Sequence, residues 1–210
     1  MTKNVHRILD KSFGKPIHIS LGQSGEYTEQ FRNLTQKEFN KVIVDLHIKH
    51  GVKWSISGDR ENRIDLYRQN ENIMREGRTI HIGIDINAPA GTPLHAPVDC
   101  EVVHAEYESG AGNYGWFIVL KCQTDDGPLY LLFGHLAKNN LARVGTKLRA
   151  GDVFGFIGDF DENGNWFHHT HFQVLTGRGL DEGWMYKALC TPEQLDTIDA
   201  LCPSPMPFVI

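Results

Sequence analysis

Three histidines fall within four positions of the segment NWFHHTHFQV, residues 165–174, and the last of them leads into a β-type run. In a strand, side chains two positions apart share a face and lie about 7 Å apart, so His169 and His171 can serve one site while His168 points away. Such a pair fits a metal site, a phosphorylated histidine or a packed pair. Partners elsewhere in the chain must distinguish these possibilities.

A second candidate is the stretch HIGID, in which His81 and Asp85 are four positions apart. In a regular strand these residues would be about 13 Å apart, too far for one ion whose ligands lie about 2 Å from it. The sequence Ile-Gly-Ile-Asp-Ile is poor helix material. The chain must therefore bend between the two residues if they share an ion, and Gly83 is the residue that permits a bend.

The third candidate, His135, follows the apolar run LYLLF; taken alone, such a histidine is more often a hydrogen-bonded core residue. Together the three stretches offer His81, Asp85 and His171 as ligands, the usual make-up of a catalytic zinc site with an open fourth position. His135 and His169 remain to polarise water, orient a carbonyl and stabilise its oxyanion. This combination indicates hydrolytic chemistry.

The elements that must position these residues are mostly strands. From Thr79 onward, short β-branched runs separated by turns predict a compact all-β unit. The segments PAGTPLHAPVDCEVV and VGTKLRAGDVFGFIG share one plan of turns and strands, which indicates two related β halves. Upstream, TQKEFNKVIVDLHIKHG predicts a helix with a capping box at Thr35 and Glu38 and a stop at Gly51, and PIHISLGQSGEY predicts a short strand.

The remaining segments predict less regular structure. The polar stretch SGDRENRIDLYRQNENIMREGR is expected to form a loop, and His47 and His50 are expected to face solvent or to cap the helix end. The tail after Gly177 predicts short helices and a Pro-rich end that wraps the core. We therefore expect an N-terminal extension over 1–77 with one helix near 36–50, a β core over 78–176 and a C-terminal wrap over 177–210.

Composition limits the classes of partner. A formal charge of −5 and a pI near 6.1 predict no nucleic-acid partner and no anionic membrane partner. The start MTKNVHRILDKSFGKP has no apolar region, so we expect a cytoplasmic protein, or a periplasmic or secreted one if a precursor segment has been removed. No C-x-x-C pair occurs among the four cysteines, which predicts buried, reduced thiols. These are Cys100, Cys122, Cys190 and Cys202.

Motifs in a fixed order connect these observations. They are R-x-x-H-x-G-x-D (78–85), APAGTPLHAP, G-N-Y-G (112–115), F-G-H-L, G-x-x-L-x-A-G-x-x-x-G-x-I-G (145–158) and H-x-H-F-Q (169–173). In this order they resemble the lysostaphin-type, LytM-like zinc metallopeptidases over roughly residues 78–176. The resemblance implies a mainly β fold, the duplicated hybrid motif, with one Zn²⁺ per chain.

Carried over position by position, the resemblance implies that His81, Asp85 and His171 bind zinc and that His135 and His169 form the catalytic pair. It also implies a peptide or peptidoglycan substrate, since the family typically cleaves cross-links of bacterial cell walls, often at glycine-rich bonds.

The chain also departs from the family pattern. Phe133 stands where the family usually has Tyr, which predicts a hydroxyl missing from the edge of the site. Asn165 to His168 replace a Gly-Pro pair, which predicts a reshaped groove. The segment NGNWFHHTHFQV with the tail LCPSPM looks most similar to a cytoplasmic subgroup found beside class III aminotransferase domains. Two alternatives stay open: a catalytically silent binding or regulatory module of the same fold, and a phosphohistidine carrier. The oligomeric state is open as well.

Overall fold

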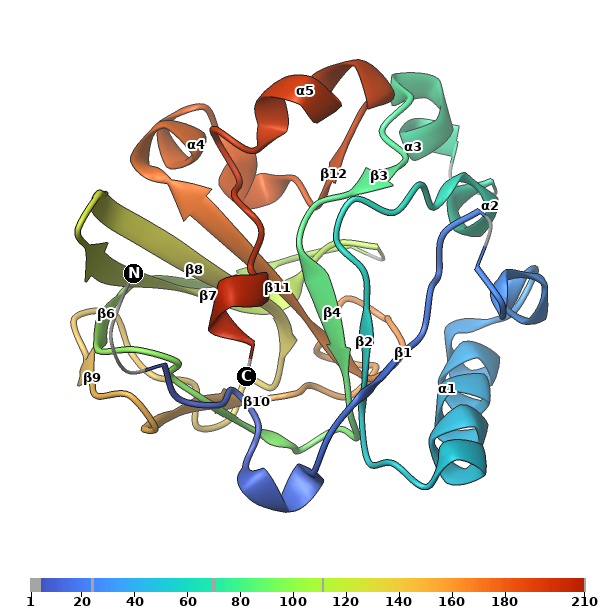
Figure 1. Ribbon diagram of the computed structural model, residues 1–210, viewed down its shortest axis with the longest axis horizontal. Coiled ribbons are helices and arrows are strands. Elements are labelled where there is room, and N and C mark those ends of the chain that lie inside the picture. The colour runs from blue at the N-terminus through green and yellow to red at the C-terminus, as the bar shows by residue number, and fades with distance from the viewer. Residues whose placement is uncertain (1–4, 24, 69–70, 111, 210) are drawn as a thin grey trace.

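The computed structural model describes residues 5–23, 25–68, 71–110 and 112–209. Its main element is an eight-stranded sheet in the spatial order β1-β2-β4-β11-β8-β7-β6-β9 (Figure 1). Only β1 and β2 pair in parallel, and every other neighbouring pair in this sheet is antiparallel. The strands are β1 (Ile17–His18), β2 (Ser55–Ser57), β4 (Ile84–Asn87), β6 (Cys100–Glu108), β7 (Gly115–Thr124), β8 (Gly127–Leu136), β9 (Lys147–Leu148) and β11 (His169–Thr176).

Two short antiparallel ladders complete the β structure. One pairs β5 (Pro93–His95) with β10 (Val153–Phe156), and the other pairs β3 (Ile80–His81) with β12 (Leu189–Cys190). The predicted mainly β fold class is confirmed.

The central strands are buried on both faces, which follows from their alternating side chains. Phe172 and Val174 of β11 pack into one hydrophobic cluster with Leu131 of β8. Leu175 and Leu132, their neighbours in sequence, pack into a second cluster on the other face. A shift of register by one residue would move every side chain to the other face and lose the packing of both clusters. The positions of the site residues on β4, β8 and β11 are therefore fixed by this packing.

The C-terminal tail covers the second face of the sheet. Its side chains Trp184, Ile198 and Leu201 belong to the second cluster. The predicted short helices are confirmed. The helical turns of the tail are α4 (Gly177–Asp181), η3 (Trp184–Tyr186), η4 (Pro192–Gln194), α5 (Leu195–Ile198) and η5 (Met206–Phe208).

The extension adds strands β1 and β2 to the sheet beside β4, and it adds helices next to them. Helix α1 (Gln36–His50) begins with the predicted capping box of Thr35 and Glu38 and ends at Gly51, whose φ is 64°. It lies outside β1 and β2 (Figure 1), and its buried Phe39 and Ile43 face a third cluster. Two 3-10 turns precede it, η1 (Lys11–Phe13) and η2 (Thr28–Phe31). The division of the chain at 77/78 and 176/177 stays a prediction.

The polar stretch after β2 is not the loop that its composition predicted. It contains α2 (Ile64–Tyr67) and α3 (Glu71–Glu76), and Asn62 forms an isolated bridge to Ile80. Buried contacts of Arg63 and Asp65 hold this stretch, and local polarity carries no signal for such contacts.

The four cysteines are buried and unpaired, as predicted. Among the residues described, no helix has the length and apolar character that a membrane crossing requires.

The expectation that His47 faces solvent is wrong. His47 is 7% exposed, and its Nε2 lies 2.8 Å from Ser55 Oγ. Ser55 Oγ also accepts from Asn87 Nδ2 at 3.0 Å, and Asn87 Nδ2 donates to Ser57 Oγ at 2.9 Å. A polar chain thus links α1 through β2 to β4, next to Asp85. Side chains that are far apart in sequence create this burial, so helical periodicity did not show it.

Burial lowers the pKa of His47 to about 4. Because the unfolded chain takes up this proton nearer pH 6.5, the stabilising effect of neutral His47 is complete above that pH and declines as the pH falls toward 4. We expect wild type to lose more unfolding free energy between pH 7.5 and 5 than His47→Gln, measured by urea denaturation. His50→Gln, on the exposed end of the same helix, is the control. Equal losses in wild type and His47→Gln would contradict this role.

Candidate metal centre

The chain bends between His81 and Asp85, as the distance argument required. β3 ends at His81 and β4 begins at Ile84, with Gly83 between them at φ 96°. A Cβ on Gly83 would lie 2.5 Å from the carbonyl oxygen of Phe172, so the close approach of β11 also requires glycine. The bend brings His81 Nε2 to 3.3 Å from Asp85 Oδ1.

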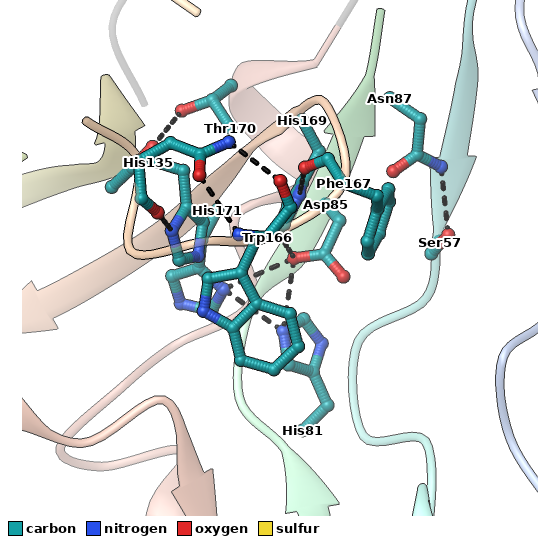
Figure 2. Close-up of polar contacts among 12 residues, drawn as sticks. Ser57, His81, Asp85, Asn87, His135, Trp166, Phe167, His169, Thr170 and His171 are labelled. Carbon is teal, nitrogen blue, oxygen red and sulfur yellow. Dashed lines mark hydrogen bonds and ion pairs between the residues drawn. The ribbon is translucent and has the colours of Figure 1, made fainter. Parts of the chain in front are cut away.

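The antiparallel pairing of β4 and β11 brings the second histidine stretch to the same place. Asp85 is the register partner of His171, and Asn87 is the partner of His169. His171 Nδ1 lies 3.3 Å from Asp85 Oδ1 and 3.0 Å from His81 Nε2. Figure 2 shows these three side chains converging. They are the predicted ligand set, and all three are buried.

The outward nitrogen of each ligand histidine is occupied by a hydrogen-bond acceptor. His81 Nδ1 donates to the carbonyl oxygen of Gly58 at 3.1 Å, and His171 Nε2 donates to Gln173 Oε1 at 3.1 Å. The Gln173 amide is oriented by its nitrogen, which donates to Trp184 O. Since a neutral imidazole has one N–H, His81 Nε2 and His171 Nδ1 present lone pairs to each other.

Two lone pairs and a carboxylate oxygen facing one another at 3.0–3.3 Å repel unless a cation lies among them. Tetrahedral ligands at zinc bond lengths of about 2.0–2.2 Å are separated by roughly 3.3–3.6 Å, close to the separations seen. Burial tends to raise the pKa of Asp85, but the nearby Arg63 guanidinium, with further help from His81, holds that pKa well below its usual range. The carboxylate is therefore ionised, and the residues fit a zinc ion.

His135 and His169 lie beside this triad, with ring centroids 4.4 Å apart. His135 Nδ1 donates to Asn163 O and His169 Nδ1 donates to Phe167 O, both at 2.8 Å. Their Nε2 atoms are thus the unprotonated ones, and that of His169 lies 3.7 Å from Asp85 Oδ1. Burial lowers the pKa of His169 to about 4, and burial followed by the neighbouring His169 lowers that of His135 well below its usual range.

The first histidine of the segment 165–174, His168, points away from the centre, as the alternation of a strand predicts. His168 Nε2 lies 2.9 Å from Asp159 Oδ1, and its ring packs against Phe160. The structure therefore brings together all five predicted site residues and excludes His168.

One expectation about the edge of the site is wrong. Phe133 lies in the hydrophobic core, stacked on Phe172 at 4.4 Å, so a hydroxyl there would not reach the centre.

A cleft of about 1070 Å³ opens over the five residues. One wall comes from the β core, where the ring centroids of Trp166 and His135 are 5.9 Å apart (Figure 2). Trp166 Nε1 donates to Asn113 O. The other wall comes from the extension and includes Phe39 and Arg63. Phe167 joins the two walls, since its ring stacks on His169 at 4.2 Å and on Phe39 at 4.3 Å.

Sequence reasoning missed two groups that hold the site. Arg63 Nη1 donates to Asp85 Oδ2 at 2.6 Å from a stretch with no motif. Asn163 holds its loop through Trp166, donating from Nδ2 to Trp166 O and accepting from Trp166 N.

Part of the chain is similar to known proteins. Residues 79–181 match the model of a family described as Peptidase family M23, a little under half of the chain. This region is therefore similar to peptidase M23 domains.

Two curated proteins are similar to the chain. A glycyl-glycine endopeptidase, ALE-1, from Staphylococcus capitis is 32% identical over 96 residues, 46% of this chain and 25% of that protein. An uncharacterized metalloprotease from Buchnera aphidicola subsp. Baizongia pistaciae is 28% identical over 130 residues, 62% of this chain and 30% of that protein. The chain thus spans less than a third of the length of either relative.

Among solved structures, the catalytic domain of the antimicrobial peptidase lysostaphin from Staphylococcus simulans is 25% identical. The match covers 56% of this chain and 79% of that domain, with a TM-score of 0.41.

Replacing Gly83 tests the bend that assembles the triad. Gly83→Ala should lower the free energy of unfolding by roughly 3 kcal/mol or more, because the strain of a positive φ is joined by a collision with Phe172 O. Gly145→Ala, at φ 87° with open space around its Cβ, should cost only about 1 kcal/mol. Urea denaturation of the metal-free proteins measures both, and equal losses would show that the close approach at Gly83 is unimportant.

Proposed function

We propose that this chain is a zinc-dependent endopeptidase of M23 type that hydrolyses peptide bonds. His81, Asp85 and His171 would hold one zinc ion through Nε2, Oδ1 and Nδ1. The observation that carries the proposal is the convergence of these three atoms, with the outward nitrogens of both histidines tied to oxygen acceptors. When bound, zinc supplies Lewis acidity, which lowers the pKa of a water molecule and polarises a carbonyl.

The remaining two histidines would handle protons. Neutral His169 and His135 each present an unprotonated Nε2, which can accept a proton and return it to the leaving amine. Their fixed Nδ1–H bonds orient the rings before substrate arrives. Phe167 and Trp166 pack against these rings and limit the access of bulk water.

For the substrate, we propose a peptide cross-link of the bacterial cell wall with glycine near the scissile bond. The name of the similar protein from Staphylococcus capitis, a glycyl-glycine endopeptidase, supports this choice. The cleft over the centre has a volume of about 1070 Å³ and is lined by residues of both the extension and the β core. Glycine-containing cross-link peptides and ordinary peptides of equal length are the substrates to compare.

Single-residue variants separate the ligands from the proton-transfer residues. His171→Ala and Asp85→Ala should lose zinc, because each removes one of three ligands. His169→Ala and His135→Ala should retain zinc and lose turnover by about 10²- to 10⁴-fold, the usual contribution of a general acid or base. Elemental mass spectrometry of protein purified without a metal-affinity tag gives the zinc content, and cleavage of a glycine-containing peptide gives turnover.

His168→Ala is the matched control, since this residue neighbours His169 and points away from the centre. It should keep both zinc and turnover. An unchanged zinc content in His171→Ala would contradict the ligand assignment. Wild type that takes up no zinc would contradict the metallopeptidase proposal as a whole.

A further inference from the structure

The segment 58–63 runs beside the strand that carries the first ligand, although it lies outside the region that matches the M23 family. Its backbone pairs with β3 and the residue before it: Arg60 N donates to His81 O, His81 N donates to Glu61 O, and Arg63 N donates to Thr79 O. These bonds are 2.8–2.9 Å long. They fix the register of the segment relative to His81.

From this position the segment contacts every part of the HIGID stretch that the site needs. Gly58 O accepts from His81 Nδ1, and Asp59 Oδ1 accepts from Gly83 N at 3.0 Å, at the bend itself. Arg63 reaches Asp85. One short segment therefore holds the first ligand, the bend and the second ligand.

The two oxygens of the Asp85 carboxylate contact different groups. Oδ2 accepts from Arg63 Nη1 at 2.6 Å, whereas Oδ1 faces His81 and His171. Arg63 is 3% exposed and Asp85 is 1% exposed. An ion pair this deeply buried is weakly screened, and losing one partner leaves an uncompensated charge.

The guanidinium is itself held from its other side. Arg63 Nε donates to Glu61 Oε2 at 3.2 Å, and both Glu61 oxygens lie 3.3 Å from the backbone nitrogen of Leu21. Asp85 and Glu61 raise the pKa of Arg63 even though burial acts to lower it. The position of the charge is thus set by contacts on two sides of one planar group.

We propose that segment 58–63 is an integral part of the metal centre and that Arg63 is its positioning residue, which restricts Asp85 to one ligand oxygen. Because Arg63 holds Oδ2, Asp85 presents Oδ1 to the ion, and the centre keeps a position for water and substrate. This inference rests on the proposed metal site. It implies that the extension builds the centre instead of only covering it.

The test replaces zinc with Co²⁺, whose visible absorption is strong in four-coordinate sites and weaker when more ligands bind. Wild type should give the strong spectrum. Arg63→Met removes the donor and frees Oδ2, so the cobalt form should lose absorption per bound ion and shift its bands. Arg63→Lys keeps a charged donor and should restore the wild-type spectrum.

Arg178→Met is the control from outside the segment. The Arg178 guanidinium donates to Glu182 Oε1 at 2.7 Å, and neither residue lines the cleft over the metal centre, so the spectrum should stay unchanged. Circular dichroism checks that each variant folds. If Arg63→Met does not fold, Arg63→Gln takes its place. A wild-type spectrum in a folded variant lacking the Arg63 donor would overturn this inference. Failure of wild type to bind cobalt at all would instead count against the metal site itself.

Discussion

The structure depends on one electrostatic constraint, the meeting of two imidazole lone pairs and a carboxylate oxygen at a buried point. These atoms repel in the absence of a cation, and the fold brings them together nonetheless. Burying these groups without a partner lowers the free energy of unfolding unless a bound ligand compensates for it. Buried groups of one polarity are a common sign of a functional site. The oxygen acceptors behind each ring, at Gly58 and Gln173, keep the lone pairs turned inward.

The sheet supplies the rigidity that this constraint requires. β4 and β11 pair with Asp85 opposite His171, and hydrophobic clusters fill both faces of the central strands around them. A shift of register by one residue would turn the site residues toward the hydrophobic core. Core packing and the geometry of the site therefore require the same pairing of β4 with β11. The extension supports the site through a stack of aromatic rings. Phe31 stacks on Phe39, Phe39 stacks on Phe167, and Phe167 stacks on the ring of His169.

Much of the centre was predictable because it follows from local geometry. The alternation of a strand separates His168 from His169 and His171, and the length of a strand requires a bend at Gly83. Helix α1 was predictable from its caps. Contacts between distant segments were not. Arg63, the burial of His47 and the short helices α2 and α3 all depend on packing against strands that lie elsewhere in the sequence. Phe133 was misplaced because the resemblance located the residue but not the direction of its side chain.

The most direct test of the central claim is a crystal structure of the zinc-loaded chain with anomalous data collected at the zinc absorption edge. The account predicts one strong anomalous peak per chain, bonded to His81 Nε2, Asp85 Oδ1 and His171 Nδ1 at about 2.0–2.2 Å. A peak elsewhere, for example at the buried thiols of Cys190 and Cys202, or no peak at the triad after zinc loading, would contradict it.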